Sequence, residues 1–170
     1  MSNPYVLGID PGITGALAAY SLTDRTMVDL HDMPVSGKAT GKGQQVDAHG
    51  VCELLESYAP LHVFIEAQRP MPGQGVTSTL SLGRTIGVLE ASCAALRIPY
   101  TLVEPAVWKR KAGLIKADKG QSVTRALQLW PALASKLARK KDHGRAEAAL
   151  IAWHGVQTAV WLQDYADKLK

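Results

Sequence analysis

The stretch that decides the fold is Tyr5-Val6-Leu7-Gly8-Ile9-Asp10-Pro11-Gly12-Ile13-Thr14-Gly15-Ala16-Leu17. An apolar run of strand-forming residues ends in the carboxylate of Asp10, and a turn with Pro and Gly then leads into a second apolar run. The pattern predicts a hairpin whose buried first strand carries Asp10 at its end. A carboxylate there has lost hydration, which a cation or hydrogen-bond donors must replace. Asp10 is therefore a candidate metal ligand, although it could equally cap the turn through nearby free N–H groups.

Two other segments place acids in comparable positions. The short apolar run His62–Glu66 ends in Glu66, and a segment rich in Pro and Gly follows it. Near the end of the chain, a helical pattern opens in which His143 and Glu147, at i and i+4, share one face. The strand-end acids and this His/Glu pair form an oxygen-rich set with one nitrogen, which suits Mg²⁺ or Mn²⁺ better than zinc.

Two further acids are weaker candidates for the same site. Asp142, directly before the His/Glu pair, either binds metal at the edge of the site or caps the helix. Glu104 ends the strand-like run Tyr100–Val103, but Pro105 turns the chain at once. We rank Glu104 below Glu66 for this reason.

Four motifs occur in order along the chain: Gly8-Ile9-Asp10-Pro11-Gly12, Phe64-Ile65-Glu66, Ser81-Leu82-Gly83 and the helix with His143 and Glu147. Together they resemble the RuvC family of Holliday junction resolvases, and in particular its phage and prophage branch. The resemblance implies a ribonuclease H-like α/β fold with a central mixed five-stranded sheet and helices on both faces. It also implies a homodimer that acts on branched DNA with Mg²⁺ or Mn²⁺.

The charges of a phosphodiester indicate how such a site would work. Two divalent ions neutralise a phosphate oxygen, activate water and stabilise the leaving oxygen. We assign Asp10 as the carboxylate that bridges the ions, with Glu66 and Glu147 as its partners. His143 is the fourth group, which either ligates one ion or positions the water.

The chain departs from the family pattern in two places. Glu147 stands where the family commonly has Asp, so the choice between Mg²⁺ and Mn²⁺ stays open. After the second acid, the family often carries an aromatic residue that wedges into the junction, whereas this chain has Arg69 and Met71 in that region. Met71 is a candidate wedge, and flaps, forks or RNA:DNA hybrids remain alternative substrates.

Positive charge is concentrated in one part of the chain. Residues 105–145 hold 11 of the 19 Lys and Arg residues but only two acids, so the segment carries +9 and the remainder −5 of the net +4. A charge run is often only a solvated face. Its place beside the proposed metal site favours a surface for phosphates, formed by Lys109, Lys111, Lys119, Lys140, Lys141 and Arg145.

The resemblance bears most directly on Lys119, because the family carries an Asp-Lys pair there whose lysine meets DNA phosphates. Lys109 and Lys111 belong to a short helix that the family also has. Trp108 in that helix is more typical of a core residue than of a platform for base stacking.

Periodicity predicts the remaining elements. Strands are expected at 5–10, 15–21, 27–33, 62–66 and 100–103, and helices at 47–58, 77–96, 105–114, 122–130 and from 142 through Trp153. The segment 36–45 is expected to be a loop. Gly83 and Gly87 would let another backbone approach, either within the chain or from a second subunit.

Composition excludes several classes of protein. The 170 residues, 46% of them hydrophobic, suit one globular domain over residues 1–170. No apolar run is long enough to span a membrane and no signal peptide is apparent, so we expect a cytoplasmic protein. The two cysteines have no CxxC spacing, which argues against a zinc site.

Two functions from other classes remain open. The first motif also resembles the phosphate loop of actin-like and sugar-kinase ATPases, which need two such domains around a cleft. Alternatively, the basic segment alone could make a non-catalytic module that binds branched DNA. In that case the acids would only weaken binding to phosphates.

Overall fold

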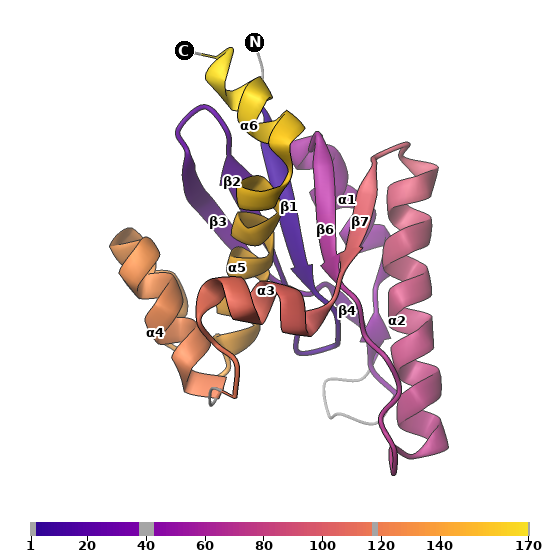
Figure 1. Cartoon of the computed structure of the whole chain (residues 1–170). Coiled ribbons are helices and arrows are strands. Elements are labelled where there is room, and N and C mark those ends of the chain that lie inside the picture. The colour runs from indigo at the N-terminus through magenta and orange to yellow at the C-terminus, as the bar shows by residue number, and fades with distance from the viewer. Residues whose placement is uncertain (1–2, 38–42, 117–118, 170) are drawn as a thin grey trace.

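A computed structural model describes residues 3–37, 43–116 and 119–169 of the chain. Its main sheet consists of β1 (Tyr5–Asp10), β2 (Ala16–Ser21), β3 (Thr26–Asp32), β6 (His62–Glu66) and β7 (Tyr100–Val103). The strand order is β3-β2-β1-β6-β7 (Figure 1). β1, β2 and β3 pair antiparallel, while β6 is parallel to β1 and β7 to β6. The predicted mixed five-stranded sheet is confirmed.

Alternating side chains of the central strands build two separate cores. Val6 and Phe64 belong to the core on one face of the sheet. Leu7 and Ile65, one residue further along each strand, belong to the core on the other face. Successive side chains of a strand point to opposite faces, so every second residue of β1 and β6 shares a face.

The helix α5 (His143–Thr158) covers the first face and lies against β1 and β2 (Figure 1). The approach is close because the facing residues are small. A Cβ added at Gly8 would lie 2.2 Å from the carbonyl oxygen of Ala148, and one at Gly155 would lie 2.2 Å from the Phe64 ring. Small residues therefore fix where α5 sits on the sheet.

The second face is covered by α1 (Ala48–Tyr58) and α2 (Val76–Ala95). Asp47 caps α1, because its side chain accepts a hydrogen bond from the N–H of His49 at 3.2 Å. Val51 and Leu89 pack in the core beneath these helices. The sheet thus has helices on both faces, as expected.

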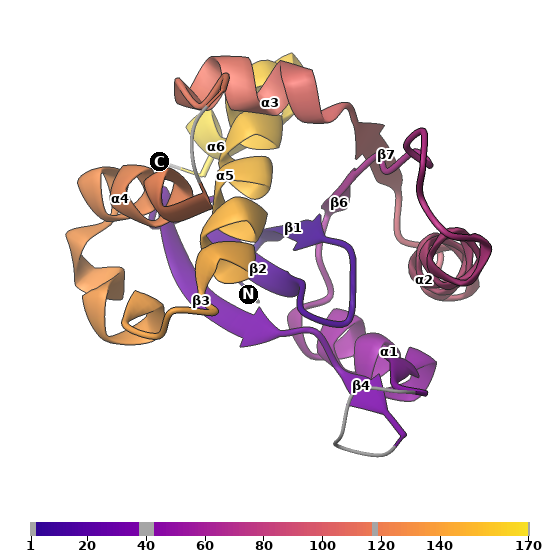
Figure 2. The same ribbon diagram turned by 90° about the horizontal axis from the view of Figure 1, so that it is seen from below.

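Four shorter helical segments complete the chain. They are α3 (Pro105–Ala112), α4 (Lys119–Leu129), the 3₁₀ helix η1 (Pro131–Leu137) and α6 (Val160–Asp167). Seen from below, α3 and α4 flank α5 close to the end of β1 (Figure 2). Among the described residues, no helix has both the length and the apolar character needed to cross a membrane.

The structure corrects several boundaries; the helix predicted at 122–130, for example, begins at Lys119 and ends at Leu129. The loop predicted at 36–45 is shorter, because β4 (Val35–Ser36) pairs with β5 (Gln45–Val46) at its two ends, and residues 38–42 lie outside the described part. The helix predicted from 142 continues to Thr158. A separate helix, α6, then follows it.

Gly83 and Gly87 on α2 do not pack against any other part of the chain that the structure describes. Both are exposed, and a Cβ added to either would meet no atom within 4 Å. Close packing of α2 on the sheet therefore does not account for them.

Candidate active site

Asp10 and Glu66 lie at one edge of the sheet, on one face. β1 and β6 are parallel and adjacent, so their carboxyl ends meet at the same edge. Asp10 is four residues after Val6 and Glu66 is two after Phe64, which places both on the face covered by α5. Glu66 is buried and Asp10 is half-buried.

The start of α5 brings the third acid and the histidine to the same edge. A Cβ added at Gly144 would lie 2.8 Å from the carbonyl oxygen of Thr14 and 3.1 Å from Oδ2 of Asp10. The first turn of α5 therefore lies directly beside the Asp10 carboxylate, where the positive end of the helix dipole favours an anion. His143 and Glu147, on either side of Gly144, are both half-buried.

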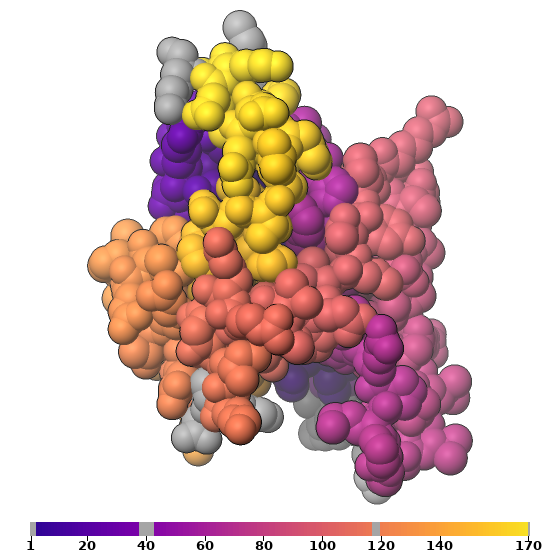
Figure 3. All heavy atoms as spheres, viewed as in Figure 1, coloured from indigo at the N-terminus to yellow at the C-terminus, as the bar shows by residue number. Residues whose placement is uncertain are grey.

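A cavity of about 490 Å³ opens between these elements. In the space-filling view the surface is hollowed between α3 and the segment that leads into α2, with indigo atoms of the N-terminal part at its floor (Figure 3). The cavity is lined by Asp10, Pro11, Thr14, Gly15, Glu66, Gln68, Lys109, Leu114, Lys116, Ser122, His143 and Glu147. All four residues predicted to be catalytic are therefore brought around one space.

The Glu66 carboxylate is held by donors on both oxygens. Trp108, buried in α3, donates its indole N–H to Oε1 at 2.9 Å. Gln68 donates its Nε2 to Oε2 at 3.4 Å and to the carbonyl oxygen of Pro11 at 2.9 Å. Glu66 is thus tied to α3 and to the turn that follows β1.

The donor set has the chemistry that hard divalent cations prefer: three carboxylates and one imidazole around one cavity. Across the described ranges, no group of three His, Cys, Asp or Glu side chains stands close enough together to enclose an ion. The residues fit a divalent metal centre by type and by shared location, and they surround a space rather than a single coordination point.

Asp142, expected either to bind metal at the edge of the site or to cap the helix, does not line this cavity. Its buried side chain accepts bonds from Arg139, at 2.7 Å from the backbone N–H and 2.8 Å from Nε. Burial would raise the pKa of Asp142, and the bonds from Arg139 outweigh burial and lower it. The side chain makes no capping bond either, so Asp142 anchors the segment before α5.

A second anchor of the same segment is Asp32, at the end of β3. Arg139, Lys141 and Arg145 reach Asp32 at 2.8, 3.2 and 2.6 Å. Burial alone would raise the pKa of Asp32, but the hydrogen bonds from these three cations lower it to about 2. Arg145 also donates to the carbonyl oxygen of Lys136 at 3.1 Å, and its side chain is only 19% exposed. Arg145 was expected on a phosphate-binding surface. In the structure its guanidinium is part of the network around Asp32.

The other basic residues divide into two groups. Lys109 lines the cavity itself, and so does Lys116. Lys140 and Lys141 line an adjoining hollow of about 550 Å³ that shares His143 with the cavity. Lysine side chains therefore line both the cavity that holds the acids and the adjoining hollow on the other side of His143.

Of the remaining DNA-binding candidates, none whose side chain the structure describes lines the cavity. Lys111 is exposed on α3 and does not line the cavity, and the side chain of Lys119 lies outside the part that the structure describes. Arg69 pairs with Glu104 at 2.5 Å, and Glu104 does not line the cavity of the candidate site. Met71 is 74% exposed in the loop before α2.

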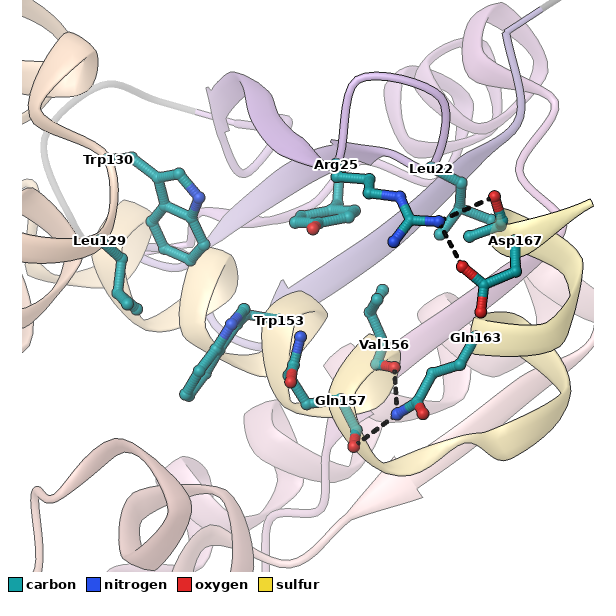
Figure 4. Close-up of a pocket in the computed structure, with 11 residues that line it drawn as sticks. Leu22, Arg25, Leu129, Trp130, Trp153, Val156, Gln157, Gln163 and Asp167 are labelled. Atoms are coloured by element: carbon teal, nitrogen blue, oxygen red, sulfur yellow. Dashed lines mark hydrogen bonds and ion pairs between the residues drawn. The ribbon is translucent and has the colours of Figure 1, made fainter. Parts of the chain in front are cut away.

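A different cavity, of about 500 Å³, lies at the other end of the sheet (Figure 4). Its walls include Trp130 and Trp153. Arg25, after β2, donates to Ala166 at 3.0 Å and pairs with Asp167 at 2.6 Å, which ties α6 to the hairpin. None of the candidate catalytic residues lines this cavity.

Sequence reasoning missed four residues of the site. Lys116 was counted among the basic residues but not singled out, and Gln68 and Ser122 carried no recognisable pattern. Trp108 was correctly expected in the core, where it is fully buried. The bond from its indole to Glu66 joins positions 42 apart in sequence, and no local pattern predicts such a contact.

Comparison with solved structures shows that this mixed five-stranded sheet with helices on both faces has the fold of RuvC structures. The structure of Thermus thermophilus RuvC in complex with a Holliday junction substrate matches with a TM-score of 0.66 at 20% identity, over 93% of this chain and 96% of that chain. A second Thermus thermophilus RuvC structure matches with a TM-score of 0.57 at 20% identity, over 92% and 96% of the two chains.

The yeast mitochondrial Holliday junction resolvase Ydc2 has the same fold, with a TM-score of 0.57 at 20% identity over 99% of this chain and 84% of that chain. No protein-family model matches the sequence. No curated protein matches it either. The likeness to these solved structures therefore establishes the fold.

Proposed function

We propose that the chain is a metal-dependent, structure-selective DNA endonuclease that resolves four-way junctions by paired nicks. The observation that carries the proposal is that Asp10, Glu66, His143 and Glu147 surround one cavity at the carboxyl ends of β1 and β6. Lysines on the cavity wall and in the adjoining hollow supply the complementary charge for a phosphate backbone. Thermus thermophilus RuvC, which has the same fold, has been solved with a Holliday junction.

In this proposal, Asp10, Glu66 and Glu147 would hold Mg²⁺ or Mn²⁺, with His143 as the fourth group. Bound divalent ions would neutralise the scissile phosphate, activate water and stabilise the leaving 3′-oxygen. Three acids around one cavity would repel a phosphate in the absence of cations, so a role in DNA binding alone gives no reason for their shared location.

The chain's own residues would do the rest. Lys109 and Lys116 would draw the phosphate into the cavity. Trp108 and Gln68 hold the Glu66 carboxylate, and His143, between the cavity and the basic hollow, is placed to orient or deprotonate the attacking water.

The substrate is tested by nicking assays with Mg²⁺ on a four-way junction, a flap, an RNA:DNA hybrid and a linear duplex. We expect symmetric nicks on the junction and little cutting of the duplex. Equal cutting of linear duplex would contradict the resolvase assignment, and preferred cutting of a flap or hybrid would move the assignment to another ribonuclease H-like nuclease. ATP binding, expected to be absent, tests the ATPase alternative.

Replacement of Asp10 by Asn separates a nuclease from a binding module. The change removes the carboxylate proposed to bridge the ions, so we expect cleavage to be abolished, with junction affinity in Ca²⁺ unchanged or improved. Circular dichroism and thermal unfolding control for folding. If the variant fails to fold, Asp10 has a structural role in the turn.

We also propose that two copies pair through α2. Val76 and Leu80 on this helix are 86% and 73% exposed, and the exposed Gly83 and Gly87 leave room for another backbone. A two-fold enzyme matches a two-fold junction and accounts for paired nicks.

A further inference from the structure

Trp108 combines full burial with a polar bond that packing alone does not require. Its side chain is 0% exposed in the core beneath α3. A buried indole N–H needs an acceptor, because an unsatisfied donor costs free energy. Here the acceptor is the Glu66 carboxylate at 2.9 Å, across a sequence separation of 42. A neutral donor in the core is therefore directed at the most deeply buried acid of the candidate site.

The two donors to Glu66 differ in strength. The Trp108 bond has ordinary hydrogen-bond length, whereas the Gln68 bond to Oε2, at 3.4 Å, is at the long end. Gln68 makes its shorter bond, at 2.9 Å, to the carbonyl oxygen of Pro11. Trp108 is therefore the main restraint on the rotation of the Glu66 carboxylate.

The Trp108 indole also contacts the side chain of Lys109, the next residue of α3. The ammonium of Lys109 lies 5.2 Å from the centroid of the Trp108 ring, within the range of a cation–π contact. Lys109 and Glu66 both line the cavity. One rigid side chain thus contacts a group that would bind phosphate and a group that would bind metal.

We propose that Trp108 is a positioning residue that fixes the Glu66 carboxylate for divalent ions and sets its distance from α3. The inference rests on the proposed nuclease function. The chemistry is that of outer-sphere partners of metal ligands, whose hydrogen bonds orient the ligand before the ion arrives. The bond from the indole to Oε1 fixes the plane of the Glu66 carboxylate. The remaining lone pairs of the carboxylate therefore have a fixed direction and stay available to an ion.

The sharpest test replaces only the N–H. Site-specific incorporation of 3-benzothienylalanine at position 108 substitutes sulfur for the indole N–H and keeps the shape of the ring, so packing is retained. We expect the half-saturating Mn²⁺ concentration for nicking to rise by about 10- to 100-fold. Thermal stability and junction affinity in Ca²⁺ should stay close to those of the parent protein.

The matched controls separate positioning from packing. Trp108→Phe removes the N–H together with ring volume, so it should show the same Mn²⁺ defect plus a lower unfolding temperature. Trp161→Phe changes a half-exposed tryptophan on α6, far from the cavity lining, and should leave the Mn²⁺ dependence unchanged. A benzothienyl variant with the parent's Mn²⁺ dependence would overturn the inference.

A measurement without DNA keeps this inference separate from the proposed function. Mn²⁺ binding by calorimetry should weaken by the same factor in the benzothienyl variant, and Glu66→Ala should shift the Trp108 indole proton signal in the ion-free protein. If the parent binds Mn²⁺ but cuts no branched DNA, the nuclease proposal fails while weakened binding still supports positioning. If the variant binds Mn²⁺ as tightly as the parent, positioning fails, whatever the protein cuts.

Discussion

Gly144 is the residue at which the start of α5 meets Asp10. A side chain there would have to share space with the carbonyl of Thr14, 2.8 Å from the added Cβ, and with Oδ2 of Asp10 at 3.1 Å. The absence of a Cβ lets the first helical turn lie beside the carboxylate. Because α5 approaches so closely, its Glu147 lines the same cavity as Asp10.

We predict that Gly144→Ala impairs activity more than stability. Overpacking costs about 2 kcal/mol, and the higher helix propensity of alanine returns about 1 kcal/mol, so the net loss should be about 1 kcal/mol. Nicking should fall at least tenfold, because α5 must shift away from Asp10. Urea unfolding and nicking rates measure the two effects.

The control for this variant is Gly120→Ala on α4, outside the proposed subunit interface, where an added Cβ meets no described atom within 4 Å. It should gain about 1 kcal/mol of stability from helix propensity alone. Parent-like nicking by Gly144→Ala would show that the spacing between α5 and Asp10 is not critical.

At the scale of the element, the placement of α5 depends on the segment before it. Arg139 contacts both Asp142 and Asp32, and Arg145 in the first turn contacts Asp32 as well. These contacts join the start of α5 to the end of β3. The basic segment therefore has a structural part, around Asp32, and a part that faces the cavity and the adjoining hollow.

Replacement of Asp142 distinguishes an anchor from a metal ligand. Asp142→Ala removes hydrogen bonds to a charged group, so it should cost about 2 kcal/mol, measured by urea unfolding. The Mn²⁺ concentration for half-maximal nicking should change less than threefold. A shift as large as that of a variant at Glu66 would instead show that Asp142 binds the ion.

The Asp32 network predicts a pH dependence. The folded pKa of about 2 lies below the ordinary value of 3.8, so the carboxylate stabilises the fold above pH 4 and loses that contribution as the pH falls from about 4 to about 2. Because Asp32 is 45% exposed, solvent screening limits its contribution to about 1 kcal/mol.

Urea unfolding from pH 6 to pH 2 measures this contribution. Asp32→Asn should be less stable than the parent at pH 6, and the two free energies of unfolding should converge near pH 2. A constant difference across this range would show that the ionised carboxylate is not the stabilising form.

Most of the helices and strands could be predicted from the sequence. The apolar runs 5–10 and 62–66, each ending in an acid, predicted two strands of the sheet, and the helical pattern at 47–58 predicted α1. The short strands β4 and β5 were missed, because two-residue pairs have no periodicity. The ion pairs of Asp142 and Arg145 could not be predicted, because they depend on Asp32 and Arg139 lying beside them in the fold.

The same limit applies to the site. The i, i+4 spacing placed His143 and Glu147 on one face, and the strand ends placed Asp10 and Glu66 at one edge. Trp108, Gln68 and Lys116 came only from the tertiary structure. They lie on α3 and on loops whose position is set by long-range packing rather than by a local motif.

At the scale of the whole molecule, the proposed dimer makes a prediction about α2. Leu80 is 73% exposed, so Leu80→Glu should leave the stability of one chain within about 0.5 kcal/mol of the parent. Light scattering should show a shift from dimer to monomer, and paired incision should give way to single nicks. A parent-like dimer would place the subunit interface elsewhere.

The central claim is that acids far apart in sequence form one divalent metal centre. Crystals soaked in Mn²⁺ and measured at the manganese absorption edge test it directly. The account predicts anomalous density in the cavity, within coordination distance of Asp10, Glu66 and Glu147. Saturating Mn²⁺ with no density there, or with density only at other surface acids, would contradict it.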